Sequence, residues 1–198
     1  MTAFALPSWF GADGFSLSLD TTQRSFASPF GGSEQVVDLG SDRWKATLSA
    51  SPRTYDEAAA LEALIAGMRG MTNTLAIHHL LRKQPRGTLR GAASTVNNAA
   101  AGAASIVVQA PVVGQTLLAG DMLGIGGLLL QVAADCVTNG VGNMTVPLVN
   151  RLRVAISNGT AVVWDRPTAP FRLASKPVVQ FAPGYAQGVT MDFVEAIG

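Results

Sequence analysis

The sequence predicts a mainly β protein with one helix, an α+β fold that also contains a small inserted β unit. Residues 55–69 have the pattern of a complete helix with both ends specified. Most other apolar segments are short, several alternate apolar with polar residues, and Gly, Asn or Pro separates them, which is typical of strands and turns. The helix and the strands are therefore expected to bury their apolar faces against one another.

Both ends of the helix are marked by local chemistry. Thr54 and Glu57 have the spacing of a capping box, in which the threonine hydroxyl accepts the N–H of residue 57 and the carboxylate reaches back. Arg69 would lie in the last turn, where the helix dipole favours a cation, and Gly70 suits the left-handed conformation that ends many helices. We therefore expect the helix to span residues 55–69.

An apolar stripe on this helix matches strands on either side of it. The stripe follows helical spacing and consists of Leu61, Leu64, Ile65 and Met68. Residues 44–50, 74–78 and 189–193 alternate apolar with polar side chains, as half-buried strands do. We expect a strand, helix, strand unit in which the helix packs on a sheet, and we expect the C-terminal strand to join the same sheet.

Composition divides the chain into two predicted domains. Residues 1–90 combine strands, the helix and long polar loops such as DTTQRS and PFGGSEQ, and residues 171–198 carry two further strand-like pieces separated by a turn signal at Pro183 and Gly184. Residues 91–170 are rich in Gly, Ala, Val and Asn, with short strand candidates that predict a small barrel or sandwich. The flanking stretches would then form one discontinuous domain around this insert.

Charge and hydrophobicity favour protein partners. Charged residues make up 14% of the chain, the formal net charge is +1, and hydrophobic residues make up 48%. This balance gives no bulk attraction to nucleic acid or to an anionic membrane, and the apolar surface is instead expected to be covered by other protein chains. No apolar run is long enough to span a bilayer, and no basic residue precedes the N-terminal hydrophobic run. We therefore expect neither membrane insertion nor secretion.

No residue combination predicts a catalytic, cofactor or metal site. His78 and His79 are the only histidines, and neighbours on a strand point to opposite faces, which prevents joint binding of one metal ion. Cys136 is the only cysteine, and its apolar surroundings favour a buried thiol. The GIGG stretch at 124–127 lacks the following helix that a phosphate-binding loop needs, so we interpret it as a β-turn. The sequence does not predict an enzyme.

Two binding functions are weighed as alternatives. Four arginines could form a basic strip for nucleic acid (Arg151, Arg153, Arg166 and Arg172). Aromatic residues are not interleaved with these arginines as stacking platforms, so we expect no nucleic-acid binding. Trp164, Trp9 or Tyr185 could stack on sugar rings if exposed, whereas Trp44 is expected in the core. A carbohydrate-binding module is therefore the stronger of the two alternatives.

The order of landmarks along residues 43–196 resembles a known family. The landmarks are RW-x-A-x-L, a helix ending in RG, then PRG, GD-x-L-x-IGG, V-P-L-x-x-x-L-R-x-x-I-x-x-G-x-x-V, P-x-x-x-F-x-L and a closing DFVEA. Together they are similar to the distal tail proteins, minor tail proteins found at the tail tip of long-tailed bacteriophages.

This resemblance carries its own expectations. It implies a split-barrel-like domain with one helix, assembled into a ring that we expect to be a hexamer, and an inserted β domain that faces outward. It implies tail-tube and tail-hub proteins as partners, a place in the virion tail after synthesis in the cytoplasm of the bacterial host, and no catalytic residues. Another tail component (tube, terminator or hub), or a carbohydrate-binding module that contacts the host surface, is the alternative.

The N-terminal segment is expected to contact a neighbouring subunit. Five large apolar residues fall within its first fifteen positions: Phe4, Leu6, Trp9, Phe10 and Phe15. Their spacing fits neither strand alternation nor a helical stripe, and Pro7 and Gly11 interrupt both patterns. We therefore expect an extended arm whose aromatic residues bind an adjacent chain. The alternative is a first strand folded onto its own barrel.

Overall fold

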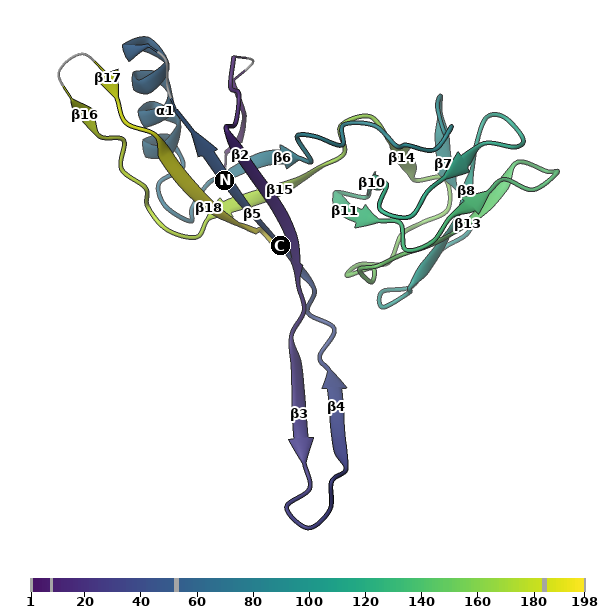
Figure 1. The fold of residues 1–198 in the computed structure, drawn as a ribbon. Coiled ribbons are helices and arrows are strands. Elements are labelled where there is room, and N and C mark those ends of the chain that lie inside the picture. The colour runs from purple at the N-terminus through teal and green to yellow at the C-terminus, as the bar shows by residue number, and fades with distance from the viewer. Residues whose placement is uncertain (1, 8, 52–53, 183–184, 198) are drawn as a thin grey trace.

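The computed structural model describes residues 2–7, 9–51, 54–182 and 185–197. Across these ranges the chain is mainly β, with a single helix, α1 (Tyr55–Gly67), as the sequence predicts (Figure 1). The described residues form two six-stranded sheets, each with its own buried core, and three two-stranded pairs. The turn expected at Pro183 and Gly184 lies outside the described residues.

The first sheet is a curled half-barrel built from both ends of the chain. Its strands, in order across the sheet, are β1 (Ala3–Ala5), β6 (Thr74–His78), β15 (Thr168–Leu173), β18 (Val189–Glu195), β5 (Arg43–Ala50) and β2 (Gly14–Asp20). β1 runs parallel to β6, and the other neighbours are antiparallel. The C-terminal strand thus joins this sheet, as its alternating pattern predicts.

The helix packs on the half-barrel through its apolar stripe. Leu61, Ile65 and Met68 are buried in one core together with alternating residues of β5, β6, β15 and β18, while Leu64 is half-buried against the same core. Trp44 is 3% exposed and belongs to this core, as expected from its place in the strand pattern. The helix therefore covers the apolar face of the half-barrel.

The helix begins where the sequence predicts and ends two residues earlier than the predicted residue 69. At the start, the N–H of Glu57 donates to Oγ1 of Thr54 at 3.2 Å. At the end, Gly67 is the last helical residue, so Arg69 lies beyond the final turn and not within it. Arg69 itself has φ 47°, and Gly70 follows at φ 65°. Two successive residues in the left-handed region reverse the chain toward β6.

The second sheet is formed by the chain between β6 and β15. Its order is β11 (Leu128–Gln131), β10 (Met122–Ile125), β14 (Ala161–Val163), β7 (Ala93–Thr95), β8 (Ser105–Gln109) and β13 (Asn143–Pro147), with β9 (Thr116–Leu117) and β12 (Cys136–Val137) paired beside it. The GIGG stretch forms a tight hairpin turn, because Gly126 and Gly127 have φ of 57° and 81° and join the paired residues Ile125 and Leu128. The division into domains at residues 90 and 170 stays a prediction.

The polar loops expected between residues 20 and 35 are only partly loops: residues 21–22 and 28–33 lie outside strands, whereas residues 23–27 and 34–35 belong to strands. β3 (Gln23–Ala27) and β4 (Glu34–Asp38) form an antiparallel hairpin that projects away from both sheets (Figure 1). A second short pair, β16 (Phe181–Ala182) and β17 (Tyr185–Ala186), lies near α1, where the rings of Phe181 and Tyr55 stack 6.4 Å apart. The loop prediction was wrong for the first pair because its polar composition hides the strand pairing.

The N-terminal segment folds onto its own chain, as the alternative of a first strand on its own barrel describes, and this corrects the expectation of an extended segment. β1 pairs with β6 in parallel, and Phe4, Leu6, Phe10 and Phe15 are half-buried against the first core. Phe4 lies over the helix so closely that a Cβ built on Gly67 would be 3.2 Å from its ring. Trp9, at 41% exposed, is the most accessible of the five predicted interface residues. A contact of this segment with a neighbouring chain stays a prediction.

We predict that Leu61→Asp lowers the free energy of unfolding by about 4 kcal/mol, because it places an unpaired carboxylate in a fully buried position. Ala63→Asp is the matched control, since residue 63 is exposed on the same helix and should lose less than about 1 kcal/mol. Chemical denaturation of both variants measures the difference. Equal midpoints would contradict the packing of the helix on the sheet.

Candidate functional site

The most distinctive feature of the surface is the projecting hairpin of residues 21–40, which we call the arm. The arm continues the ribbon of β2 and β5 outward. Asp20 pairs with Arg43 and Gln23 pairs with Asp38, so two residues on one side of the ribbon face four on the other. This irregular step separates the arm from the half-barrel and lets it leave the sheet. At about 3.3 Å per residue, the ten residues from 21 to 30 reach roughly 30 Å beyond the half-barrel.

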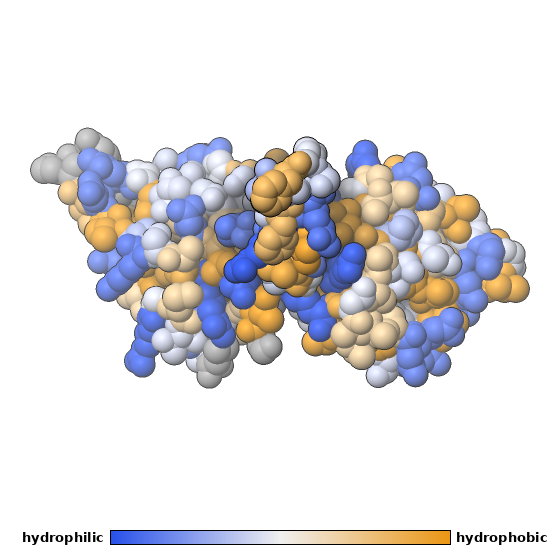
Figure 2. All heavy atoms as spheres, turned by 90° about the horizontal axis from the view of Figure 1, so that it is seen from below, coloured by the Kyte–Doolittle hydropathy of each residue, from blue (hydrophilic) through white to orange (hydrophobic). Residues whose placement is uncertain are grey.

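Large apolar side chains are exposed along the arm. Phe30 at the tip is 99% exposed, and Phe26 and Val36 are 59% and 58% exposed. Figure 2 looks along the arm from below and shows hydrophobic residues on the part that faces the viewer. Exposed aromatic residues on a projecting element are typical of a surface that a partner covers.

The arm has no core of its own. Val37 is half-buried, and every other residue from 20 to 36 and from 38 to 41 is exposed. An isolated two-stranded hairpin is only marginally stable in water, because it has one sheet layer and nothing to pack against. The arm therefore gains stability from any surface that covers its apolar side chains.

Two arginines that follow β13 of the second sheet, Arg151 and Arg153, contact the base of the arm and the adjacent half-barrel. The guanidinium of Arg151 lies 4.0 Å from the carboxylate of Asp38, and the backbone N–H of Arg151 donates to Oδ2 of Asp42 at 3.4 Å. Arg153 lies deeper, where it forms a bidentate ion pair with Glu195 and donates to the carbonyl of Asp42 at 2.9 Å. The direction of the arm is thus set where the two sheets meet.

These contacts also correct the expected arginine strip. Arg153 is largely buried in its pair with Glu195, and Arg172 lies on β15 in the first sheet. The backbone N–H of Arg166 donates to the carbonyl of Lys83 at 2.7 Å, which places Arg166 beside the end of β6. The four arginines therefore do not form one strip.

A pocket opens at the other end of β2 from the arm. It has a volume of about 570 Å³ and an apolar lining that includes Phe10, Phe15 and Leu81. Lys83 and Arg166 contribute cations to its lining. Leu81 is 82% exposed, so a large apolar side chain stands beside two positive charges.

His78 and Asp13 are the other titratable residues that line this pocket, and Asp165 is close enough to act on His78. Burial is the main cause of a lowered pKa of His78, and the positive charges of Arg166 and Lys83 lower this pKa further while Asp165 opposes them. The imidazole is therefore neutral at pH 7, and the charged side chains of the lining are the two cations and the carboxylate of Asp13. The lining is net positive and partly apolar.

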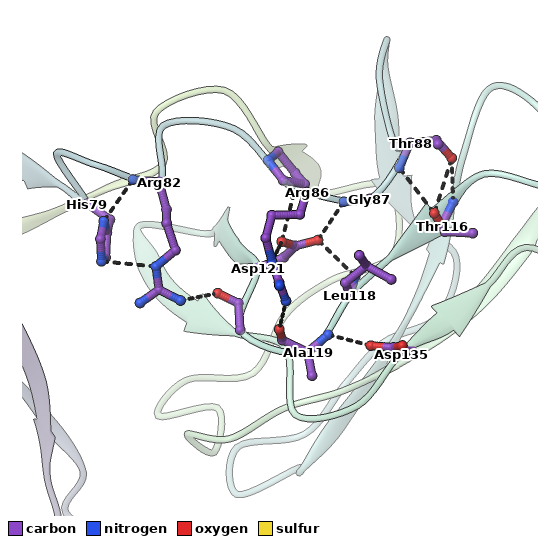
Figure 3. Close-up of polar contacts among 12 residues, drawn as sticks. His79, Arg82, Arg86, Gly87, Thr88, Thr116, Leu118, Ala119, Asp121 and Asp135 are labelled. Carbon is purple, nitrogen blue, oxygen red and sulfur yellow. Dashed lines mark hydrogen bonds and ion pairs between the residues drawn. The ribbon is translucent and has the colours of Figure 1, made fainter.

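A polar network holds the chain where it enters the second sheet (Figure 3). The carboxylate of Asp121 is 2% exposed and accepts the backbone N–H groups of Arg86, Gly87 and Leu118 at 2.8, 3.1 and 2.8 Å. A Cβ on Gly87 would lie 2.2 Å from the carbonyl oxygen of Thr116, so only glycine fits there. The PRG landmark (residues 85–87) and the GD landmark (residues 120–121) thus contact each other through the hydrogen bonds of Asp121.

His79 is part of the same junction. The backbone N–H of Arg82 lies 2.9 Å from its Nδ1, and the Nε–H of Arg82 lies 3.0 Å from its Nε2. A neutral imidazole has one acceptor nitrogen, so one of these contacts at a time is a hydrogen bond, and both donors oppose a second ring proton. Burial, and then the charge of Arg82, lower the pKa of His79 to about 4.

The remaining candidates for chemistry are placed apart. His78 ends β6 in the first sheet, whereas Cys136 begins β12 beside the second, and burial raises the pKa of its thiol. Within the described ranges, no three His, Cys, Asp or Glu side chains are grouped to hold a metal ion, and no helix has the length and apolar character to cross a bilayer.

The tryptophans do not form a sugar-binding platform together. Trp44 is buried, and its Nε1 donates to the carbonyl of Leu129 at 2.8 Å. Trp164 carries Arg90 over its ring at 5.2 Å and donates to the carbonyl of Gly91 at 2.7 Å. Trp9 is 41% exposed at the N-terminal segment.

Sequence reasoning missed both the arm and the junction. It placed the interface in the N-terminal segment, where four of the five aromatic and aliphatic residues are half-buried within their own subunit. The available signal for the arm was the pair of phenylalanines, Phe26 and Phe30, inside an otherwise polar stretch. Comparison with models of known protein families found no match, and a search of curated proteins gave no significant match.

We predict that Asp121→Ala lowers the free energy of unfolding by about 3 kcal/mol, because three backbone N–H groups lose their acceptor and one of them is buried. Asp135→Ala is the control, since the exposed Asp135 accepts one backbone N–H at 2.8 Å and should lose less than about 1 kcal/mol. Denaturant titration compares the two. An equal loss in both variants would show that the buried network is not the stabilising element.

We predict that His79 makes the protein less stable as the pH falls from about 6.5 to about 4. The pKa of His79 is lower in the folded chain than in the unfolded chain. Between these two pKa values the unfolded chain binds a proton that the folded chain does not bind, so lowering the pH favours unfolding. Above pH 6.5 this contribution to stability is fully present. Unfolding of the wild type and of His79→Asn, measured at several pH values in the window, gives the difference. Parallel pH profiles for the two proteins would refute the assignment.

Proposed function

We propose that this chain is a structural subunit that assembles with copies of itself, and that the arm binds the neighbouring subunit. The observation that carries this proposal is the exposure of Phe26 and Phe30 on a hairpin without a core. Aromatic side chains in such positions supply much of the binding energy of protein interfaces. The low content of charged residues, 14%, fits a chain that covers part of its surface with other chains.

The arm favours a repeated, head-to-tail arrangement. A projecting element that binds a surface different from itself gives each subunit one donor and one acceptor surface. When a subunit binds one neighbour through its arm and receives the arm of another, the contacts are heterologous, and they close into a ring if the rotation between neighbours divides a full turn. A ring is therefore the assembly that we infer, with a hexamer as the expected order.

The place that we propose for this ring is the tail tip of a long-tailed bacteriophage. The resemblance to distal tail proteins supports this, and a half-barrel with one helix and a second β unit agrees with what the resemblance implies. In that setting the ring joins the tail tube to the host-recognition apparatus, with tail-tube and tail-hub proteins as partners in the virion. A different tail component would use the same arm.

We predict that replacing Phe26 and Phe30 with Ser weakens self-association by roughly thirtyfold or more, the loss of one interface hot spot of about 2 kcal/mol. Because both rings are exposed in the single chain, the melting temperature of the unassembled protein should not change. Val113→Ser with Val141→Ser is the control, since both valines are exposed outside the arm.

Light scattering over a concentration series measures the assembly, and negative-stain images show its shape. The wild type should form a discrete multiple of the 20.5 kDa chain with a ring outline. A wild type that stays monomeric at high concentration, or an arm variant that assembles as well as the valine control, would refute the proposal.

A further inference from the structure

We propose that the tip of the arm, residues 28–34, inserts into the pocket at the start of β2 on a second copy of this chain. The inference rests on the proposed self-assembly and names the surface that receives the arm. Phe30 is 99% exposed at the tip, and the pocket combines exposed Leu81 with Phe10 and Phe15 in a volume of about 570 Å³. One aromatic ring and a partly apolar pocket are each left uncovered in the single chain.

Charge favours this pairing over the other pockets on the described surface. Glu34 is the charged residue of the tip, and Lys83 and Arg166 outnumber Asp13 in the pocket. A neighbouring pocket under Trp9 contains Asp13 and Glu57 and would repel Glu34. A groove between α1 and the chain before β16 contains Glu62 and Lys176, whose charges balance. A hollow over β5 and β18 contains Lys45 and Asp192, whose charges also balance. Of these four pockets, the positive one complements the tip in both charge and hydrophobicity.

The positions of tip and pocket suit contact between copies. The pocket includes Asp13 and Phe15, at the beginning of β2, whereas the arm begins after Asp20, at its end. The arm continues β2 outward, so the tip moves away from the pocket of its own chain (Figure 1). Donor and acceptor at opposite ends of one strand give a head-to-tail contact, the type that builds rings or filaments.

Thiol cross-linking between two differently labelled full-length chains tests the pairing. With Cys136→Ser as background, one protein carries Gly31→Cys beside Phe30, and the other carries Leu81→Cys at the pocket. Residue 31 has open space around its Cβ position, so the change leaves the tip intact. We expect a short thiol-reactive cross-linker to give heterodimers from the mixture. Val178→Cys, exposed at the groove beside α1, replaces Leu81→Cys as the matched control and should give few.

A charge exchange provides an independent readout. Lys83→Glu should weaken self-association by roughly tenfold, because the new carboxylate would repel the carboxylate of Glu34 on the neighbouring chain. Adding Glu34→Lys to the same chain should restore most of that loss, whereas Asp56→Lys, a charge change away from both surfaces, should not.

The possible outcomes distinguish a failure of the proposed receptor pocket from a failure of the proposed self-assembly. Heterodimers with Leu81→Cys together with rescue by Glu34→Lys support the pairing. Cross-linking through Val178→Cys, tip-to-tip dimers of Gly31→Cys alone, or no cross-link in a protein that still assembles would overturn the pocket as the receptor while leaving self-assembly intact. A wild type that remains monomeric by light scattering would overturn both.

Discussion

The structure depends on one constraint: the ribbon that begins as β2 and β5 in the half-barrel leaves its sheet and continues as β3 and β4 without any layer beneath it. Inside the half-barrel, alternate residues of β5 are buried under α1. Beyond the irregular step at Thr21 and Thr22 the same ribbon exposes both faces, including Phe26. A two-stranded ribbon with exposed aromatic side chains is only marginally stable unless another surface covers it. We propose self-assembly because a second copy of the chain is the one partner that is present wherever the protein is made.

The junction between the two sheets gives the arm a fixed base. The buried Arg153–Glu195 pair joins the second unit to β18, and the indole of Trp44 donates across the same boundary to Leu129. Buried ion pairs add little net stability but strongly disfavour arrangements in which one partner is left alone. Such a junction therefore defines orientation more than it adds stability. The ring that we propose requires such a fixed orientation, because its subunit contacts repeat at one angle.

Local patterns in the sequence were enough to predict the helix and the sheet beside it. The Thr54 cap, the stripe through Leu61 and the alternation around Trp44 each depend on neighbours a few residues apart, and the structure confirms all three. The arm was missed because strand pairing across Gln23 and Asp38 has no apolar face to mark it. The N-terminal segment was predicted to extend toward an adjacent chain because its spacing is irregular. Its parallel pairing with β6 and the contact of Phe4 with the helix are long-range, so local spacing does not reveal them. The role of Asp121 could not be predicted from the sequence either. Its partners are backbone N–H groups, which nearly every residue carries and which leave no pattern in the sequence.

Hydrogen exchange of the arm measures most directly whether it is covered in the assembled protein. The backbone amides of β3 and β4 are followed at concentrations below and above the assembly transition. We predict fast exchange in the dilute chain, because a two-stranded hairpin opens readily, and strong protection once subunits associate. Protection of the half-barrel strands should be the same at both concentrations. Arm amides that exchange equally fast in the assembled and the dilute protein would contradict the central claim that the arm is an intersubunit element.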